Sequence, residues 1–319
     1  MSNSLTRLSA HTNIVADTAD YNIIKRYKIK EATTNPSIIL QTASLPQYKQ
    51  HVQESVEYGL KTGNTLDEMI ENSMDMINVS FGQKILEVTN KIHIQIDPRL
   101  AFNVVRSVNR ALKLVGLFKE RNIEKSRIVI KLPATWEGIQ AAKILQNDYG
   151  VDCNMTTMFN LVQAAACAEA GVSCLAPFVG RIGMWYEKKS DKSPSNDIHP
   201  GVTTLKHIQS YMRKFGYETK VMGAYFLNSN EVKAISGCDI ATLPIQLIEE
   251  LIKSDDDMKD NIDTNFTIEK LDLTEDKFRW LMNEDMMATD LLSEVIRNFT
   301  ADYIELERIV KNNLMNIQK

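Results

Sequence analysis

The chain has 319 residues, of which 44% are hydrophobic and 24% are charged, a composition typical of an ordinary folded globular protein. Its formal charge of −4 and pI near 5.8 argue against a nucleic-acid-binding protein, which normally carries a basic stripe. The amino-terminal residues lack the apolar core of a signal peptide, and no apolar run reaches the length of a membrane span. We therefore expect a cytoplasmic protein with neither a nucleic-acid nor a membrane partner.

Short β-branched or apolar runs recur along the chain, and each is followed by a helical pattern. The predicted strands are residues 13–17, 30–34, 92–96, 127–132, 151–156, 173–178, 219–224 and 238–243. Amphipathic helices are predicted over residues 65–90, 100–121, 137–147, 159–170 and 202–215. About eight strand–helix units in a chain of this length favour an α/β fold of the closed (β/α)8 TIM-barrel type over an open doubly wound sheet.

The end of the chain has a different pattern. Residues 254–263 are acidic and predict a solvated loop, and residues 276–319 predict one or two long helices without a further strand. We expect these C-terminal helices to pack on the barrel, so that residues 1–319 form a single domain.

No pattern for a cofactor or a metal is evident. Neither GxGxxG nor GxxxxGK[ST] follows the first predicted strand, which argues against a dinucleotide or nucleoside triphosphate site. The four cysteines show no CxxC spacing and the five histidines are scattered, so no zinc site is predicted. The thiols are interpreted as reduced core residues.

Polar side chains stand where the predicted strands end, which is where TIM barrels carry their chemistry. These residues are Asp17, Thr33, Thr34, Asn35, Gln95, Asp97, Lys131, Asn154, Thr156 and Arg181. Each one alone has a purely structural explanation, because Asp17 could cap the next helix and Asn35 before Pro36 is a good turn initiator.

Lys131 is the exception, because it stands near the end of the buried run "RIVIKL". An ammonium group among apolar neighbours is costly, and its pKa should fall so that part of the amine is neutral. A neutral amine attacks a carbonyl group and forms an iminium, which withdraws electrons from the adjacent C–C bond. Asp17 suits the role of base for the departing hydroxyl proton, and Thr156 and Gln95 could position water.

Five segments in order along the chain resemble the signature segments of the transaldolase family. They are "VADTADY" (15–21), "EATTNPSIIL" (31–40), "IVIKLPATWEGIQAA" (128–142), "CNMTTMF" (153–159) and "PFVGRI" (177–182). Residues 278–299 resemble the C-terminal helices of that family. The resemblance implies a (β/α)8 barrel of the class I aldolase type, often dimeric, that moves a dihydroxyacetone unit between sugar phosphates through a lysine Schiff base.

Roles follow from the resemblance, position by position. It implies that Lys131 forms the Schiff base and that Asp17 is the acid/base group. It also implies that Asn35, Asn154 and Thr156 hold substrate hydroxyl groups or a catalytic water. Thr34, which precedes Asn35, is expected to lie in the same substrate-binding region. Phe178 matches an aromatic pocket wall, and Arg181 matches a phosphate-binding arginine.

Four positions depart from the family pattern. Gln95 stands where the family has a glutamate, and a carboxamide cannot take a proton from water. Ala176 replaces a serine. In "GAYFLN" (223–228), Tyr225 and Leu227 replace the serine and arginine of a "GASFRN" pattern that help to hold phosphate. A lost charge-assisted contact of this kind is typically worth about 2–3 kcal/mol.

Three hypotheses follow for the function. The leading one is a Schiff-base enzyme of transaldolase type that acts through Lys131 on a carbonyl or sugar substrate that is less phosphorylated than usual or otherwise non-standard. The second is an ordinary transaldolase of the pentose phosphate pathway, with Arg181 sufficient for phosphate. The third is a non-catalytic barrel that serves as a binding or structural subunit.

Overall fold

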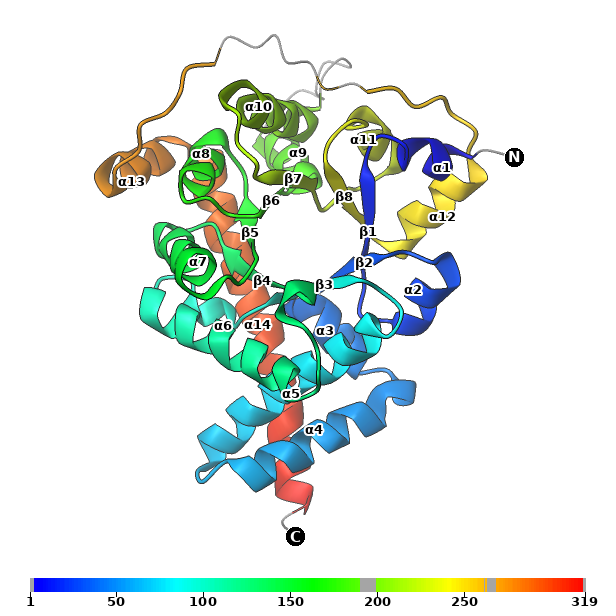
Figure 1. The fold of residues 1–319 in the computed structure, drawn as a ribbon, viewed down its shortest axis with the longest axis vertical. Helices are drawn as coiled ribbons and strands as arrows, with labels where there is room; N and C mark the ends of the chain where they lie inside the picture. Colours follow the sequence, from blue (N-terminus) through cyan, green and yellow to red (C-terminus); the bar gives the residue numbers. More distant parts are fainter. Residues whose placement is uncertain (1–2, 190–198, 261, 263–267, 318–319) are drawn as a thin grey trace.

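In the computed structural model, which describes residues 3–189, 199–260, 262 and 268–317, eight parallel strands close into a barrel in chain order. The strands are β1 (Asn13–Asp17), β2 (Glu31–Thr33), β3 (Lys91–Gln95), β4 (Ile128–Pro133), β5 (Cys153–Met158), β6 (Cys174–Pro177), β7 (Lys220–Gly223) and β8 (Ile240–Leu243). Every predicted strand overlaps one of them. The predicted TIM barrel is thereby confirmed (Figure 1).

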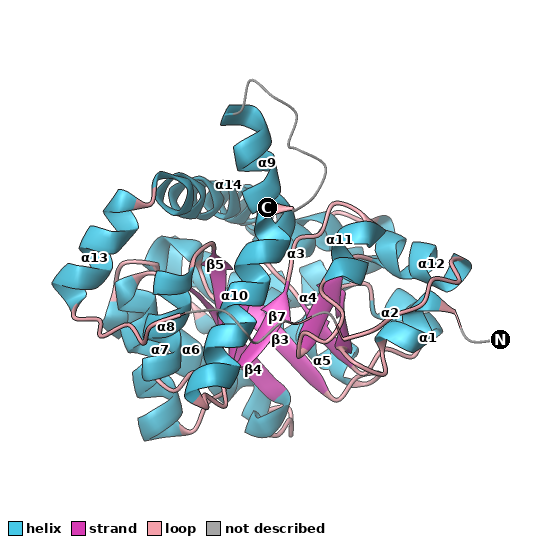
Figure 2. Ribbon diagram, turned by 90° about the horizontal axis from the view of Figure 1, so that it is seen from above, coloured by secondary structure: helices cyan, strands magenta, loops and turns pink. Residues whose placement is uncertain are grey.

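Helices connect the strands and surround the barrel (Figures 1 and 2). Those up to the sixth strand are α1 (Ser4–Leu8), α2 (Tyr21–Tyr27), α3 (Pro36–Ala43), α4 (Lys49–Thr62), α5 (Leu66–Leu86), α6 (Val104–Lys119), α7 (Trp136–Tyr149) and α8 (Leu161–Glu169). Later ones are α9 (Val179–Lys189), α10 (Pro200–Phe215), α11 (Ser229–Ala234), α12 (Ile245–Lys253), α13 (Glu275–Glu284) and α14 (Met286–Ile317). The predicted helices correspond to α5, α6, α7, α8 and α10.

Side-chain caps explain why several helices begin directly after a strand. Asp20, Asn35, Thr135 and Asn160 each accept a hydrogen bond from a backbone N–H in the first turn of the helix that follows. The cap of α2 is Asp20 and not Asp17, so the structural explanation considered for Asp17 does not apply. Each cap fixes the residue at which its helix begins, and therefore the length of the loop between that helix and the preceding strand.

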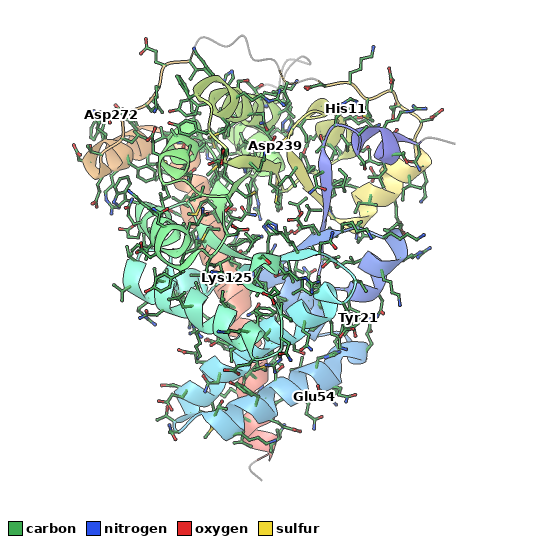
Figure 3. The ribbon with its side chains drawn as sticks, viewed as in Figure 1. His11, Tyr21, Glu54, Lys125, Asp239 and Asp272 are labelled. Atoms are coloured by element: carbon green, nitrogen blue, oxygen red, sulfur yellow. The ribbon has the colours of Figure 1, made fainter. Side chains whose placement is uncertain are left out.

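The barrel is viewed in Figures 1 and 3 from the end at which the strands begin. Figure 3 labels His11, Lys125 and Asp239, which precede β1, β4 and β8, around that end. Helix α14 passes behind the barrel in the same view and crosses the end where the strands finish. Its Val295 and Phe299 line a cavity there.

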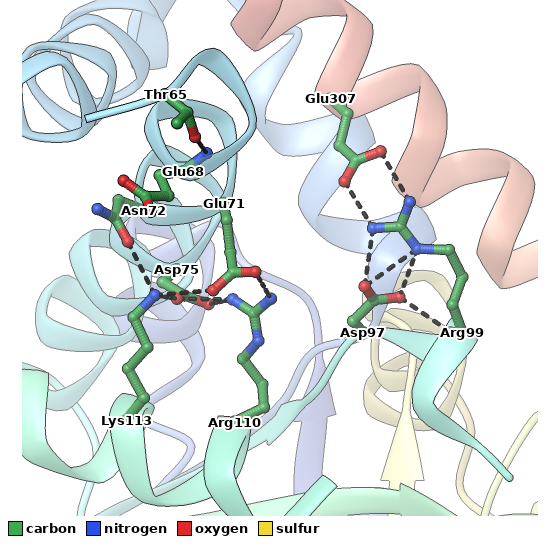
Figure 4. A network of polar contacts seen from close by, with 10 residues as sticks. All are labelled: Thr65, Glu68, Glu71, Asn72, Asp75, Asp97, Arg99, Arg110, Lys113 and Glu307. Atoms are coloured by element: carbon green, nitrogen blue, oxygen red, sulfur yellow. Dashed lines mark hydrogen bonds and ion pairs between the residues drawn. The ribbon is translucent and has the colours of Figure 1, made fainter. Parts of the chain in front are cut away.

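An ion-pair clamp fastens α14 to the end of β3 (Figure 4). The Arg99 guanidinium donates to Asp97 at 2.8 Å and to Glu307 of α14 at 2.6 Å, and it lies 5.1 Å from the Tyr303 ring centre. Asp97 therefore serves this clamp, although its position after a strand had marked it as a candidate site residue.

The acidic segment after α12 is only partly solvated, in contrast to the prediction for residues 254–263. Residues 254–260 form neither helix nor strand, but Met258 and Ile262 are buried. Asp256 pairs with Lys233 at 2.6 Å, and its backbone N–H donates to Ser4 Oγ. Residues 261 and 263 lie outside the described residues.

The cysteines, the helix lengths and the possible metal ligands bear on the thiol, membrane and metal predictions made from the sequence. All four cysteines, which lie in the described part of the chain, are buried and free. Among the described residues, no helix is long and apolar enough to cross a bilayer. The same residues contain no group of three or more His, Cys, Asp or Glu side chains arranged to hold a metal ion.

Candidate active site

A cavity of about 560 Å³ opens at the end of the barrel where the strands finish. The predicted site residues that line it are Asp17, Asn35, Lys131, Thr156, Ala176, Phe178, Arg181 and Tyr225. The remaining predicted residues, Thr34, Gln95, Asn154 and Leu227, lie outside the set of described residues that line the cavity. The strand-end rule thus brings residues from six separated segments of the chain to one place.

Lys131 is buried near the end of β4, with an exposed fraction of 6%. Its Nζ donates to the backbone carbonyl of Thr34 at 2.9 Å. Burial lowers the pKa of the amine, and the nearby Asp17 carboxylate partly opposes that shift. The geometry therefore favours an amine with more neutral character than an exposed lysine has.

Asp17 is the last residue of β1 and accepts a hydrogen bond from Thr33 Oγ1 at 2.6 Å. The Thr33 hydroxyl also lies 2.8 Å from Thr242 Oγ1 of β8. Burial raises the pKa of Asp17, while Lys131 and the Thr33 hydrogen bond oppose the shift. A carboxyl group with a raised pKa can both take up and return a proton near neutral pH.

Unpartnered polar atoms gather on the strands beside Lys131. In the register of the barrel, Gln95 of β3 and Asn154 of β5 are the neighbours of Lys131 on either side. Gln95 Oε1 and Nε2, Asn154 Oδ1 and Thr156 Oγ1 are buried and have no hydrogen-bond partner among the described residues. Because buried polar groups normally have partners, these atoms are candidates to bind substrate hydroxyl groups or water.

An arginine and two aromatic rings that line the cavity contact one another. The Tyr225 ring stacks with Phe178 at 5.9 Å between centroids, and the Arg181 guanidinium carbon lies 4.4 Å from the Tyr225 centroid. Arg181 Nη1 also lies 3.4 Å from Glu294 Oε1 of α14. Arg181 is thus oriented by a cation–π contact and by one weak ion pair.

Leu227 stands at the rim. Its side chain is 46% exposed and lies over Gly180, so close that a Cβ atom on Gly180 would be 2.7 Å from Leu227 Cγ. Because Gly180 precedes Arg181 in the chain, Leu227 lies close to the backbone of Arg181. Leu227 is not among the described residues that line the cavity, and its contact with substrate stays a prediction.

Sequence reasoning missed the buried His93 and the half-buried Glu31, which are linked to the candidate site through Asn154. His93 of β3 and Glu31 of β2 are joined by a 2.7 Å contact between His93 Nε2 and Glu31 Oε1. His93 Nδ1 lies 3.0 Å from Asn154 Nδ2. The available signal was the two-residue spacing of His93 and Gln95, which places both side chains on the same face of a strand.

Comparison with known proteins adds an independent line of evidence. Residues 14–310 match the model of the family described as transaldolase/fructose-6-phosphate aldolase. The chain is 44% identical to the transaldolase of Bos taurus over 100% of this chain and 96% of that protein. It is 42% identical to the transaldolase of Homo sapiens over the same shares of the two chains. It is 45% identical to the probable transaldolase of Drosophila melanogaster over 97% of this chain and 96% of that protein.

These relatives are named transaldolase or probable transaldolase, and none of them supports the altered phosphate pocket that Tyr225 and Leu227 suggested. The match extends across the barrel and most of α14. It includes β4, the strand that carries Lys131. The chain therefore belongs to the transaldolase family of Schiff-base transferases.

Proposed function

We propose that this protein transfers a dihydroxyacetone unit from a ketose phosphate to an aldose phosphate through a Schiff base on Lys131. The observation that carries the proposal is the buried Lys131 amine, which faces a cavity shared with Asp17 and has a pKa lowered by burial. The likeness to transaldolases favours this second hypothesis over the leading one.

In the first half of the reaction, neutral Nζ of Lys131 attacks the ketone carbon and water leaves, which forms an iminium. Asp17 then takes the proton of the hydroxyl group next to the C–C bond that breaks, and the electrons of that bond flow to the iminium. The aldehyde fragment departs and an enamine remains on Lys131. In the second half, the enamine attacks the acceptor aldehyde, Asp17 returns the proton, and water hydrolyses the new iminium.

Amide and hydroxyl groups around Lys131 would hold the transferred unit. Asn35 lines the cavity, and because its Oδ1 accepts from the Ile38 N–H, its amide NH2 is the group left to donate to a substrate hydroxyl. Gln95 and Thr156 carry unpartnered buried atoms that suit a water molecule. Gln95 would hold this water through hydrogen bonds only, since a carboxamide does not accept its proton.

A less phosphorylated substrate is the second candidate, and one observation favours it. Arg181 already has Glu294 as a counter-charge, and the other expected arginine position is Leu227. Rates with fructose 6-phosphate and erythrose 4-phosphate, compared with unphosphorylated fructose as donor, distinguish the two candidates. Near-zero transfer between the phosphates, restored by Leu227→Arg with Gln95→Glu, would favour the second candidate.

The central test is reduction with borohydride in the presence of fructose 6-phosphate, followed by mass spectrometry of peptides. We expect an adduct on Lys131 that is lost in Lys131→Met. The matched control is Lys91→Met, because Lys91 lies at the beginning of β3 and pairs with Asp152, and this variant should keep the adduct. No adduct across a panel of donor sugars, or an adduct only on other lysines, would support the non-catalytic hypothesis.

A further inference from the structure

A chain of polar contacts runs from the half-buried Glu31 of β2 through the buried His93 and Asn154 to β7. Glu31 of β2 accepts from Asn13 Nδ2 at 3.1 Å and contacts His93 Nε2 of β3 at 2.7 Å. His93 Nδ1 contacts Asn154 Nδ2 of β5 at 3.0 Å, and the same Nδ2 lies 3.6 Å from Met222 Sδ of β7. The exposed fractions of His93 and Asn154 are 2% and 0%. Nothing in the proposed reaction uses His93.

The hydrogen bonds of His93 determine which of its nitrogens carries the proton. Burial lowers the pKa of His93, against the opposing pull of Glu31, so the ring is neutral near pH 7. A carboxylate can only accept a hydrogen bond, so Nε2, which faces Glu31, carries the single proton. Nδ1 is then an acceptor.

The neighbours of Asn154 in turn determine how its amide is oriented. Both atoms that face Nδ2 are acceptors, namely His93 Nδ1 and Met222 Sδ. The NH2 group belongs on that side, and Oδ1 is the buried atom that has no hydrogen-bond partner among the described residues. Asn154 is the register neighbour of Lys131, so the two side chains project from the same face of neighbouring strands.

We propose that His93, held by Glu31, is a positioning residue that orients the Asn154 amide so that Oδ1 accepts a hydrogen bond from a hydroxyl group of the Lys131-bound substrate. The inference rests on the proposed function. In this proposal the carboxylate, imidazole and amide groups act together to select a donor that carries a hydroxyl group on the carbon next to the Schiff-base carbon. A donor without that hydroxyl group gains nothing from the Asn154 acceptor.

Two matched substitutions test this role. In His93→Asn, the side-chain oxygen falls near the position of Nδ1 and can still accept from Asn154, but contact with Glu31 is lost. In His93→Gln, the side-chain amide falls near Nε2 and keeps Glu31, but contact with Asn154 is lost. We expect donor kcat/KM to fall about tenfold in His93→Gln, as for one lost hydrogen bond to substrate, and to stay within about threefold in His93→Asn.

If His93 only provided a hydrogen-bond partner for Glu31, donor kcat/KM would fall more in His93→Asn than in His93→Gln. That result, or equal values in the two variants, would overturn the proposal. In an Asn154→Ala background, the two His93 variants should no longer differ in donor kcat/KM. A difference that persists there would show that His93 acts by another route.

Wild-type protein provides a test that does not depend on how the variants fold. Nitrogen-15 NMR of the His93 ring should show a protonated Nε2 and an unprotonated Nδ1 at pH 7, and the opposite tautomer would overturn the proposal. The two levels of inference fail separately. An inactive wild type without a Lys131 adduct rejects the proposed function, whereas an active wild type with the wrong variant order rejects only the role of His93.

Discussion

The guanidinium carbon of Arg181 lies 4.4 Å from the centre of the Tyr225 ring, and its Nη1 lies 3.4 Å from Glu294 Oε1 of α14. Tyr225 adopts a left-handed backbone conformation with φ of 54°, which presents its ring to both Arg181 and Phe178. A side chain that the family pattern does not include at this position thus helps to orient a cation that lines the cavity.

The first prediction concerns Glu294→Gln. Removal of this counter-charge makes Arg181 more available to a phosphate group, so KM for fructose 6-phosphate should fall about two- to threefold, in line with an exposed pair worth about 0.2–1 kcal/mol. KM for unphosphorylated fructose should not change. Glu305→Gln is the control, since Glu305 lies on the same helix and pairs with Arg308. A higher KM for the phosphorylated donor would contradict the expected competition.

The second prediction concerns Asp17→Asn and pH. The Lys131 amine must be neutral to attack, so the rate of adduct formation rises with pH as the amine loses its proton. The Asp17 carboxylate raises the pKa of Lys131. Its removal should therefore move the midpoint of the pH profile for borohydride trapping to lower pH. At the same time, turnover should fall about a hundredfold or more, because the proton shuttle is lost. A midpoint that moves to higher pH would show that the two groups do not interact as described.

The third prediction concerns the clamp between β3 and α14. Arg99→Leu leaves the Asp97 carboxylate buried without its cation, which should lower the free energy of unfolding by about 2–3 kcal/mol in urea titrations. Arg308→Ala removes another arginine–glutamate pair, which is exposed, and should leave the urea midpoint nearly unchanged. Equal effects of the two substitutions would indicate that the clamp contributes no more than a surface ion pair.

The fourth prediction concerns two glycines. A Cβ atom on Gly180 would lie 2.6 Å from the Tyr225 carbonyl oxygen, so Gly180→Ala must displace the loop that carries Tyr225. We expect a loss of about 1–3 kcal/mol of stability and a higher KM for phosphorylated donors. Gly116 of α6 has nothing within 4 Å of such an atom, and Gly116→Ala should stabilise the protein by about 0.5–1 kcal/mol. Thermal unfolding and steady-state kinetics of both variants measure these effects.

The barrel and the strand-end residues that line its cavity could be predicted because they depend on local pattern. Each strand shows as a short apolar run, and the strands meet at one end of a closed barrel whatever the details of packing. Lys131 stood out because a lysine at the end of a buried run is costly. Asp17 and Thr156 followed from the same rule, although their roles as catalytic groups stay predictions.

Contacts between distant segments could not be predicted. The pairing of Arg181 with Glu294 joins residues 113 positions apart, and the His93 contact with Asn154 joins residues 61 positions apart. Packing also decides three further features, namely the contact of Asp97 with the α14 clamp, the exposed position of Leu227 and the burial of Met258. The sequence alone determined which residues stand at the strand ends, because the period of the strands and the caps of the helices are encoded locally. Only the tertiary structure decided which of them touch, since hydrogen bonds and ion pairs depend on distances that barrel closure and the course of α14 establish.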